Sequence, residues 1–170
     1  MFLSLPDGRV RVAMGAARVG EPGTTVTLGE QTWPVTAVDV GNPHAVVALA
    51  TSTDVAQLDL GTAPTWTPRA AFPAGVNVEF IAAQDDHRVT MRVFERGVGE
   101  TESCGTGTVA AARASALAAG ESDGVWTIVV PGGEVEVELA GDQAWLTGPA
   151  CIVARGVLDW PDATPQQQGA

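Results

Sequence analysis

The residues best suited to chemistry lie in one glycine-rich stretch, positions 94–111, which reads FERGVGETESCGTGTVAA. Cys104 stands there at the start of a helix that is built from small residues. The first amides of a helix lack internal partners, and the helix dipole favours negative charge near them. We therefore expect the pKa of the Cys104 thiol to be lowered. The amides of Gly105, Thr106 and Gly107 could also hold a carboxylate beside this thiol.

Two other interpretations of the stretch stay open. A free cysteine is most often a buried, inert side chain, although a glycine-rich helix entrance is an unusual place for one. Residues 105–110, GTGTVA, also fit the GxGxxA pattern of a nucleotide-binding loop. The preceding strand is expected to end too early for such a loop. No strand ending in an acidic residue follows about twenty residues later, so the nucleotide interpretation is the weaker one.

Further polar residues lie at expected turns and strand ends. Asn42 and His44, in the turn GNPH, could supply an amide hydrogen bond and an imidazole that handles protons, or His44 could be purely structural. Glu95 and Arg96 end a strand beside the glycine-rich loop, where a surface ion pair is the equal alternative. Asn77, taken alone, only begins a strand.

Several classes of site are excluded by residue type. All nine cationic residues are arginine. Without lysine the chain can form neither a Schiff base with pyridoxal phosphate nor a P-loop. No group of His, Cys, Asp and Glu has metal-ligand spacing, so we expect no metal. The second cysteine, Cys151, follows Gly148-Pro149 in an apolar strand and is expected to be buried and inert.

The composition indicates one globular domain. The chain has 170 residues, of which 45% are hydrophobic, and its net charge is −11. That charge repels phosphate backbones and anionic lipids, so no nucleic-acid or membrane partner is expected. The N-terminus, MFLSLPDGRV, has no basic region and does not resemble a signal peptide. We therefore expect a cytoplasmic protein, with two cysteines that build no disulfide framework.

Alternating apolar residues predict that most of the chain is β-structure. Two helices are expected: 52–60, capped by Ser52 or Thr53, and 105–119, ended by Gly120. The second contains seven alanines and should be buried. The fold class is therefore α+β, a strongly bent antiparallel sheet wrapped around one central helix over residues 1–160, with a polar, disordered tail at 161–170. The strands expected by residue number are 9–12, 26–28, 33–40, 44–49, 77–82, 88–95, 125–130, 134–139, 144–147 and 151–157.

With these elements in order, the chain resembles the C-terminal lobe of the diaminopimelate epimerase family. ERGVGET followed shortly by CGTG is highly specific, and GNPH and GVNVEF occur in the expected order. The matching segments are VDVGNPHAVV (38–47), GVNVEFI (75–81), MRVFERGVGET (91–101) and SCGTGTVAA (103–111), with a weaker echo in GPA (148–150).

The resemblance implies a cofactor-independent epimerase with two pseudo-symmetric lobes, each offering one cysteine across a closed cleft. One thiolate would take the α-proton of LL-2,6-diaminopimelate and the other thiol would return a proton to the opposite face, giving the meso form for lysine and cell-wall synthesis. Cys104 matches the C-terminal catalytic cysteine, and His44 and Glu95 match positions that assist the two thiols. Residues matching substrate-binding positions are Asn42, Asn77, Glu95, Arg96, Gly105 and Thr106.

The resemblance also implies a small amino-acid substrate and a partner. The family's N-terminal lobe, with its own cysteine, is absent from this sequence, so we expect the second thiol to come from that lobe or from a homo-oligomer. Two alternatives stay open. One is a related pyridoxal-independent isomerase, such as a proline racemase or a phenazine-biosynthesis-like protein. The other is an isolated lobe that binds its ligand but is catalytically incomplete.

Overall fold

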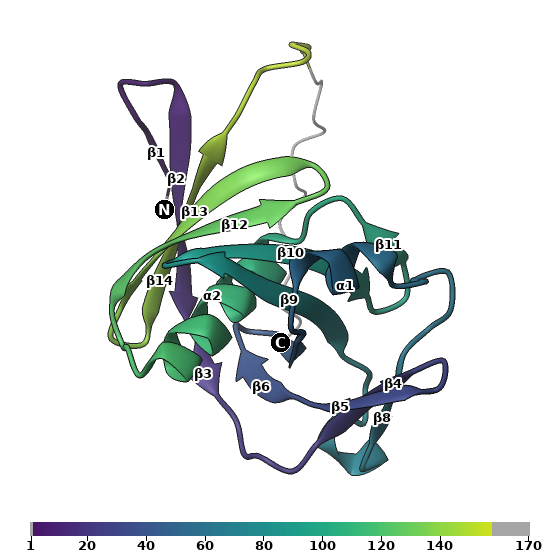
Figure 1. Cartoon of the computed structure of the whole chain (residues 1–170). Helices are drawn as coiled ribbons and strands as arrows, with labels where there is room; N and C mark the ends of the chain where they lie inside the picture. The colour runs from purple at the N-terminus through teal and green to yellow at the C-terminus, as the bar shows by residue number, and fades with distance from the viewer. Residues whose placement is uncertain (1, 158–170) are drawn as a thin grey trace, which may run out of the picture.

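A large, strongly bent sheet wraps around one helix in the computed structural model, which describes residues 2–157 (Figure 1). In chain order the elements are β1 (Phe2–Ser4), β2 (Arg9–Ala16), β3 (Arg18–Val19), β4 (Thr25–Leu28), β5 (Gln31–Pro34), β6 (Thr36–Asp39), β7 (Pro43–Ala48), α1 (Ser52–Gln57), β8 (Thr65–Thr67), a 3-10 turn (Arg69–Ala71), β9 (Asn77–Asp85), β10 (Arg88–Glu95), β11 (Gly99–Thr101), α2 (Gly105–Ala119), β12 (Gly124–Val130), β13 (Gly133–Ala140) and β14 (Gln143–Pro149). The α+β class is therefore confirmed.

The strands form two sheets. The larger follows the order β1-β2-β14-β13-β12-β10-β9-β7-β6-β3, with β11 paired to β10, and the smaller follows β5-β4-β8. The strand pairs are antiparallel, as expected, with two exceptions: β7 pairs with β9 and β10 pairs with β12 in parallel. The connections explain both exceptions. The chain passes through α1 between β7 and β9 and through α2 between β10 and β12, and such crossovers return a strand in the same direction.

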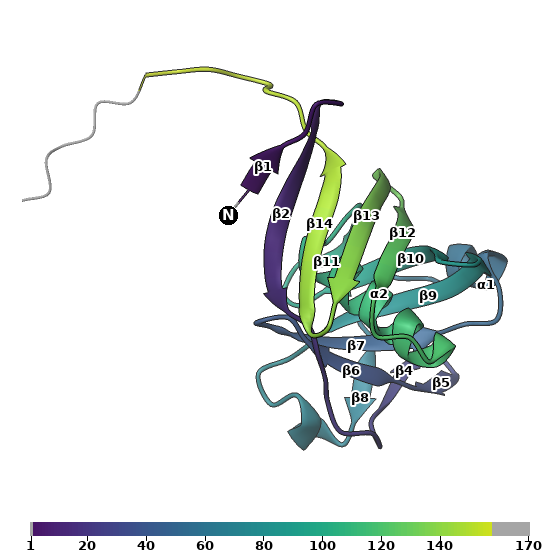
Figure 2. The ribbon, with the colours of Figure 1, turned by 90° about the vertical axis from the view of Figure 1, so that its left-hand side faces the viewer.

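Helix α2 lies inside the bend of the large sheet (Figures 1 and 2). Its bounds and its end at Gly120, which adopts a left-handed conformation with φ of 75°, are those expected from the sequence. Most of its side chains are small and buried, so strands can approach it closely on several sides. Val109 and Ala112 of the helix belong to the same core as Met91 and Ile128 of the sheet. The helix entrance, with Cys104, is thereby held in a fixed position against the sheet.

Helix α1 is shorter than expected. It ends at Gln57, and its N-terminal cap is Thr51, not Ser52 or Thr53. Thr51 and Asp54 cap each other reciprocally, which satisfies two amides at the helix start. At the other end, Arg92 Nη1 donates to three carbonyl oxygens, those of Val55, Ala56 and Leu58. The C-terminal carbonyl groups of α1 are therefore satisfied by an arginine of β10. This long-range contact cannot be inferred from the local sequence.

The end of the described chain departs from the expectation. Residues 151–157 form no strand, and Cys151 is exposed, so its predicted burial is wrong. Strand β14 ends at Pro149, opposite Arg9 near the tip of β2, and the following residues run past the sheet. The expected tail at 161–170 lies outside the described residues. Four strands of two or three residues, β1, β3, β8 and β11, were not expected because they are too short to show alternation.

Candidate active site

Cys104 is the N-terminal cap of α2. Its Sγ accepts a hydrogen bond from the Gly107 amide at 3.4 Å and lies 3.6 Å from the Thr106 hydroxyl. The Gly105 amide stands in the same first turn, where it has no partner within the helix. The Cys104 side chain is buried, with 8% of the residue exposed. The entrance of the helix therefore presents one thiol and unpaired amides in a sheltered position.

The expected lowering of the Cys104 pKa is wrong. Burial raises the pKa of this thiol, and the carboxylates of Glu95 and Glu79 add to the increase. The hydrogen bonds from Thr106 and Gly107 act in the opposite direction but are outweighed. The sequence shows the helix entrance but neither the burial nor the two acidic neighbours, because both arise from distant parts of the chain. Burial and the two carboxylates therefore favour the thiol over the thiolate.

His44 lies at the start of β7 and is completely buried. Its Nδ1 is 2.6 Å from Glu79 Oε1, and its Nε2 is 3.1 Å from Asn42 Oδ1. Asn42, in the turn before β7, is half-buried. The structure therefore joins Asn42 and His44, as their shared turn suggested, and adds a carboxyl group from β9.

Glu79 is the residue that sequence reasoning missed. It is fully buried on β9, opposite Val46 of β7 and Val93 of β10. Burial raises the pKa of its carboxyl group, and the contact with His44 partly offsets that increase. The available signal was an acidic residue inside the otherwise apolar run 78–83, where a charge is costly unless it is paired.

The carboxyl group of Glu79 also reaches α2. A Cβ at Gly107 would lie 2.8 Å from Glu79 Oε1 and 3.3 Å from Cys104 Sγ. Both groups therefore face the same glycine in the first turn of the helix. Only a residue without a side chain allows this approach. The glycine thus brings the buried acid and the thiol close to each other.

Asn77, the first residue of β9, meets Arg96 in the turn that follows β10. The Arg96 amide donates to Asn77 Oδ1 at 2.9 Å, and the Arg96 guanidinium donates to the Ala74 carbonyl. Gly75, at a positive φ of 89°, leaves the room that the Arg96 side chain occupies. Asn77 is buried and Arg96 is exposed, so the pair extends from the core to the surface.

Glu95 ends β10 and accepts a hydrogen bond from the Thr101 hydroxyl at 2.5 Å. Thr101 lies in β11, which folds back antiparallel on β10 and places its Thr101 opposite Val93. The charge of this carboxylate acts to raise the pKa of Cys104. Thr101 was not singled out from the sequence. The short strand β11 that positions it shows no alternation.

Adjacent strands therefore gather residues that are far apart in the chain. His44 on β7 is paired with Asn77 on β9, and β10 beside them carries Glu95. The contacts run from Asn42 through His44 and Glu79 to the helix turn that holds Cys104. Together they form a polar cluster that combines a thiol, two carboxyl groups and an imidazole. Such a set can take up, hold and release protons.

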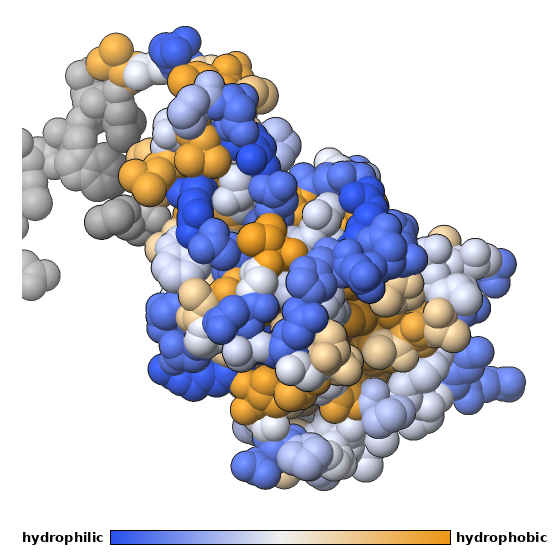
Figure 3. Space-filling model, turned by 60° about the vertical axis from the view of Figure 1, so that its left-hand side comes forward, coloured by the Kyte–Doolittle hydropathy of each residue, from blue (hydrophilic) through white to orange (hydrophobic). Residues whose placement is uncertain are grey.

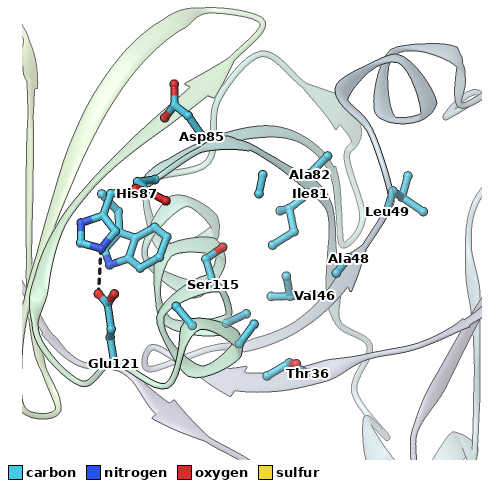
Figure 4. Close-up of a pocket in the computed structure, with 16 residues that line it drawn as sticks. Thr36, Val46, Ala48, Leu49, Ile81, Ala82, Asp85, His87, Ser115 and Glu121 are labelled. Atoms are coloured by element: carbon cyan, nitrogen blue, oxygen red, sulfur yellow. Dashed lines mark ion pairs between the residues drawn. The ribbon is translucent and has the colours of Figure 1, made fainter.

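The larger apolar cavity lies elsewhere. This pocket, open to solvent on one side, has a volume of about 700 Å³ and lies between α2 and the strands β7 and β9, with Val46, Ile81 and Ser115 on its walls (Figure 4). At its rim His87 pairs with Glu121 at 2.8 Å. None of the candidate site residues lines this cavity.

Within residues 2–157, no group of three or more His, Cys, Asp or Glu side chains is arranged to hold a metal ion. Over the same described range, neither helix has the length and apolar composition to cross a membrane.

Several solved structures share this fold, and two of them illustrate the similarity. A phenazine biosynthesis protein from Bacillus anthracis superposes with a TM-score of 0.59 and 13% identity, covering 87% of this chain and 60% of that one. A probable proline racemase from Agrobacterium radiobacter superposes with a TM-score of 0.55 and 22% identity, covering 89% and 54%. The chain thus has the lobe fold that these proteins share.

Among the proteins with this fold, the sequence comparisons identify the family to which the chain belongs. The diaminopimelate epimerase family model matches residues 36–153, and the chain belongs to this family. It is 47% identical over 150 residues to the diaminopimelate epimerase of Mycolicibacterium smegmatis, covering 88% of this chain and 51% of the relative. It is 49% identical over 158 residues to that of Mycobacterium tuberculosis, covering 91% and 54%. The chain therefore spans about half the length of the curated relatives it matches.

Proposed function

We propose that this chain is one lobe, supplying one of two catalytic cysteines, of an enzyme that epimerises LL-2,6-diaminopimelate to meso-diaminopimelate, a step of lysine and peptidoglycan biosynthesis. The observation that carries the proposal is the position of Cys104 at the entrance of α2, where its thiol and the carboxyl group of Glu79 face the same glycine, in a chain of this family. The relatives that match along most of this chain are named diaminopimelate epimerases, which supports the same substrate here.

The reaction requires two proton-transfer groups on opposite faces of one carbon. On one face a thiolate takes the α-proton, leaving a carbanion. On the other face a thiol gives a proton to that carbon, so one C–H bond breaks and one forms. A protonated Cys104 can donate the proton in one direction of the reversible epimerisation. In the reverse direction its thiolate would act as the base. The second thiol belongs to the part of the enzyme that this chain lacks.

The carbanion needs stabilisation because the α-proton of an amino acid is very weakly acidic. The free amides at Gly105 and Thr106, at the positive end of α2, can hold the substrate carboxylate and spread the developing charge. Asn42 and Asn77 would hold polar groups of the substrate, and Arg96 would attract its carboxylate. These groups are fixed by the fold before the substrate arrives, so little reorganisation is needed in the transition state.

Glu95 and His44 would set the protonation of the thiols. Glu95 stands near Cys104 and opposes its ionisation, which keeps the proton on sulfur until the substrate is in place. His44 lies on the buried side and contacts Glu79, whose carboxyl group faces Gly107 in the helix turn that holds Cys104. Closure by the missing lobe would exclude water and strengthen each of these interactions.

The direct test measures LL-to-meso conversion and incorporation of solvent deuterium at the α-carbon. We expect the purified chain alone to give no inversion and the chain mixed with the N-terminal half of the Mycobacterium tuberculosis relative to give it. Cys104→Ser should abolish inversion in the mixture, and Cys151→Ser, the matched control, should leave it unchanged. Full inversion by the chain alone, or by Cys104→Ser in the mixture, would refute the two-lobe proposal.

The second candidate is a lobe that binds diaminopimelate but does not epimerise it. It is favoured by one observation: the other cysteine, Cys151, is exposed beyond β14 and outside the polar cluster. Calorimetric binding of diaminopimelate to the chain, with no deuterium incorporation in the mixture, would support this candidate over the epimerase.

A further inference from the structure

A carboxyl, an imidazole and an amide form a continuous chain of contacts beneath the site. Glu79 Oε1 lies 2.6 Å from His44 Nδ1, and His44 Nε2 lies 3.1 Å from Asn42 Oδ1. Glu79 and His44 are completely buried, whereas Asn42 is half-buried. The chain therefore runs from the core of the sheet to the rim of the polar cluster.

The types of atom in this chain determine where the protons lie. An amide oxygen can only accept a hydrogen bond, so the contact with Asn42 Oδ1 requires a proton on His44 Nε2. A second proton must lie between Nδ1 and Glu79, because neither a carboxylate facing a bare nitrogen nor two donors would bond at that distance. This proton can belong to the carboxyl group or to the ring. In both cases Nε2 keeps its own proton.

We propose that Glu79 is a positioning residue of the site: through His44 it holds the Asn42 amide with its oxygen turned inward and its NH₂ group turned toward the substrate. Asn42 then offers only hydrogen-bond donors outward. A site that presents donors selects a carboxylate and rejects groups that need an acceptor. This last step rests on the proposed function, whereas the arrangement of protons does not.

The neighbours of Glu79 fix the position of its side chain. It is flanked by Val46 on β7 and Val93 on β10, and its carboxyl group faces Gly107 in the first turn of α2. The ionisable groups around it are His44, Glu95 and Cys104. Burial raises the pKa of Glu79, which supports a proton on the Glu79–His44 contact at neutral pH.

The test is direct because the chain has only two histidines, each paired with a glutamate. His44 pairs with Glu79 in the core, and His87 pairs with Glu121 at the surface. Long-range ¹⁵N–¹H correlation spectra of the ¹⁵N-histidine-labelled chain at pH 7 show which ring nitrogen carries a proton. The variant His87→Gln assigns the two rings. We expect His44 Nε2 to be protonated and to exchange slowly with water.

Three variants separate positioning from mere packing. Glu79→Met removes every hydrogen bond to Nδ1, and we expect the His44 Nε2 proton signal to be lost or to exchange rapidly. Glu79→Gln can still donate to Nδ1 through its NH₂ group, and we expect the Nε2 signal to persist. Glu121→Gln is the matched control on the other pair and should alter only the His87 signals.

The outcomes that overturn the proposal are specific. A wild-type His44 with its proton on Nδ1 alone would mean that Asn42 turns its NH₂ group inward. An unchanged Nε2 signal in folded Glu79→Met would mean that Glu79 does not govern the ring. If Glu79→Met does not fold, the spectra of the wild type and of Glu79→Gln still show whether His44 Nε2 carries a proton.

The consequence for the substrate is tested separately in the mixture with the relative's N-terminal half. Loss of one hydrogen bond to a charged group predicts a KM for LL-diaminopimelate that rises about tenfold or more in Glu79→Met, with a smaller change in kcat. Inversion with unaltered KM, together with a lost Nε2 signal, would refute the role of Asn42 orientation in binding. Absence of inversion with the wild-type chain would refute the proposed function. The arrangement of protons would still be tested by the spectra, which do not depend on activity.

Discussion

At the scale of single residues, Cys104 shows burial and hydrogen bonding in competition. The amide of Gly107 and the hydroxyl of Thr106 stabilise a thiolate, as the entrance of a helix should. The loss of water around the sulfur and the nearby carboxylates of Glu79 and Glu95 oppose it and prevail. The balance therefore favours the protonated thiol, which is the form that the proposed proton-donor role requires.

This balance predicts the order of thiol reactivity in the folded chain. With iodoacetamide at pH 7.5 we expect Cys151, which is exposed, to be alkylated at least about tenfold faster than Cys104. Because the pKa of Cys104 lies above its ordinary value of 9.0, its rate should keep rising as the pH increases beyond that value. Mass spectrometry of the two peptides measures both rates. Cys151→Ser isolates the Cys104 signal, and faster native labelling of Cys104 would contradict the prediction.

At the scale of elements, the site depends on how closely α2 approaches β9. Gly107 makes that approach possible, because the position its Cβ would take is 2.8 Å from the Glu79 carboxyl group. Gly105, two residues earlier, has only ordinary contacts at that position, with Leu146 at 3.4 Å and Met14 at 3.8 Å. Two glycines in one helical turn therefore differ in what surrounds them.

We expect Gly107→Ala to lower the free energy of unfolding by about 1–3 kcal/mol, because the added methyl group must displace buried atoms. Gly105→Ala is the matched control. It should change stability by less than about 1 kcal/mol, or raise it slightly, because alanine favours helix more than glycine does. Urea denaturation followed by circular dichroism measures both. Equal effects of the two substitutions would show that the contact with Glu79 is not tight.

At the scale of the whole molecule, apolar side chains are exposed at the end of the large sheet. Strand β1 is an edge strand, with Phe2 72% and Leu3 57% exposed. Ile152 and Val153, beyond β14, are also exposed. The space-filling view shows apolar residues on this projecting end (Figure 3). A free strand edge with apolar side chains is a template for pairing with another chain.

We therefore expect the isolated chain to self-associate with increasing concentration. Leu3→Lys should weaken that association at least about tenfold, since charges on edge strands oppose pairing. Val125→Lys is the matched control, because Val125 is 51% exposed but lies on β12, which is paired on both sides. Sedimentation velocity measures the dissociation constants. Equal effects of the two lysines would place the association elsewhere on the surface.

The sequence by itself determined the local features. The alanine-rich composition and Gly120 set the bounds of α2, alternation located most of the longer strands, and the GNPH, ERGVGET and CGTG segments identified the family and the candidate residues. These features depend on neighbours within a few positions, through helix capping, turn geometry and side-chain periodicity. They can therefore be read from the chain without knowledge of its partners in space.

The tertiary structure alone decided the rest. It set two pairs of strands parallel, left Cys151 exposed, raised the pKa of Cys104 and placed Glu79 against His44. Each of these depends on contacts between residues far apart in the chain, such as the 35 positions that separate His44 from Glu79. Burial and the electric field of neighbouring groups exist only once the sheet has wrapped around α2, so no local pattern encodes them.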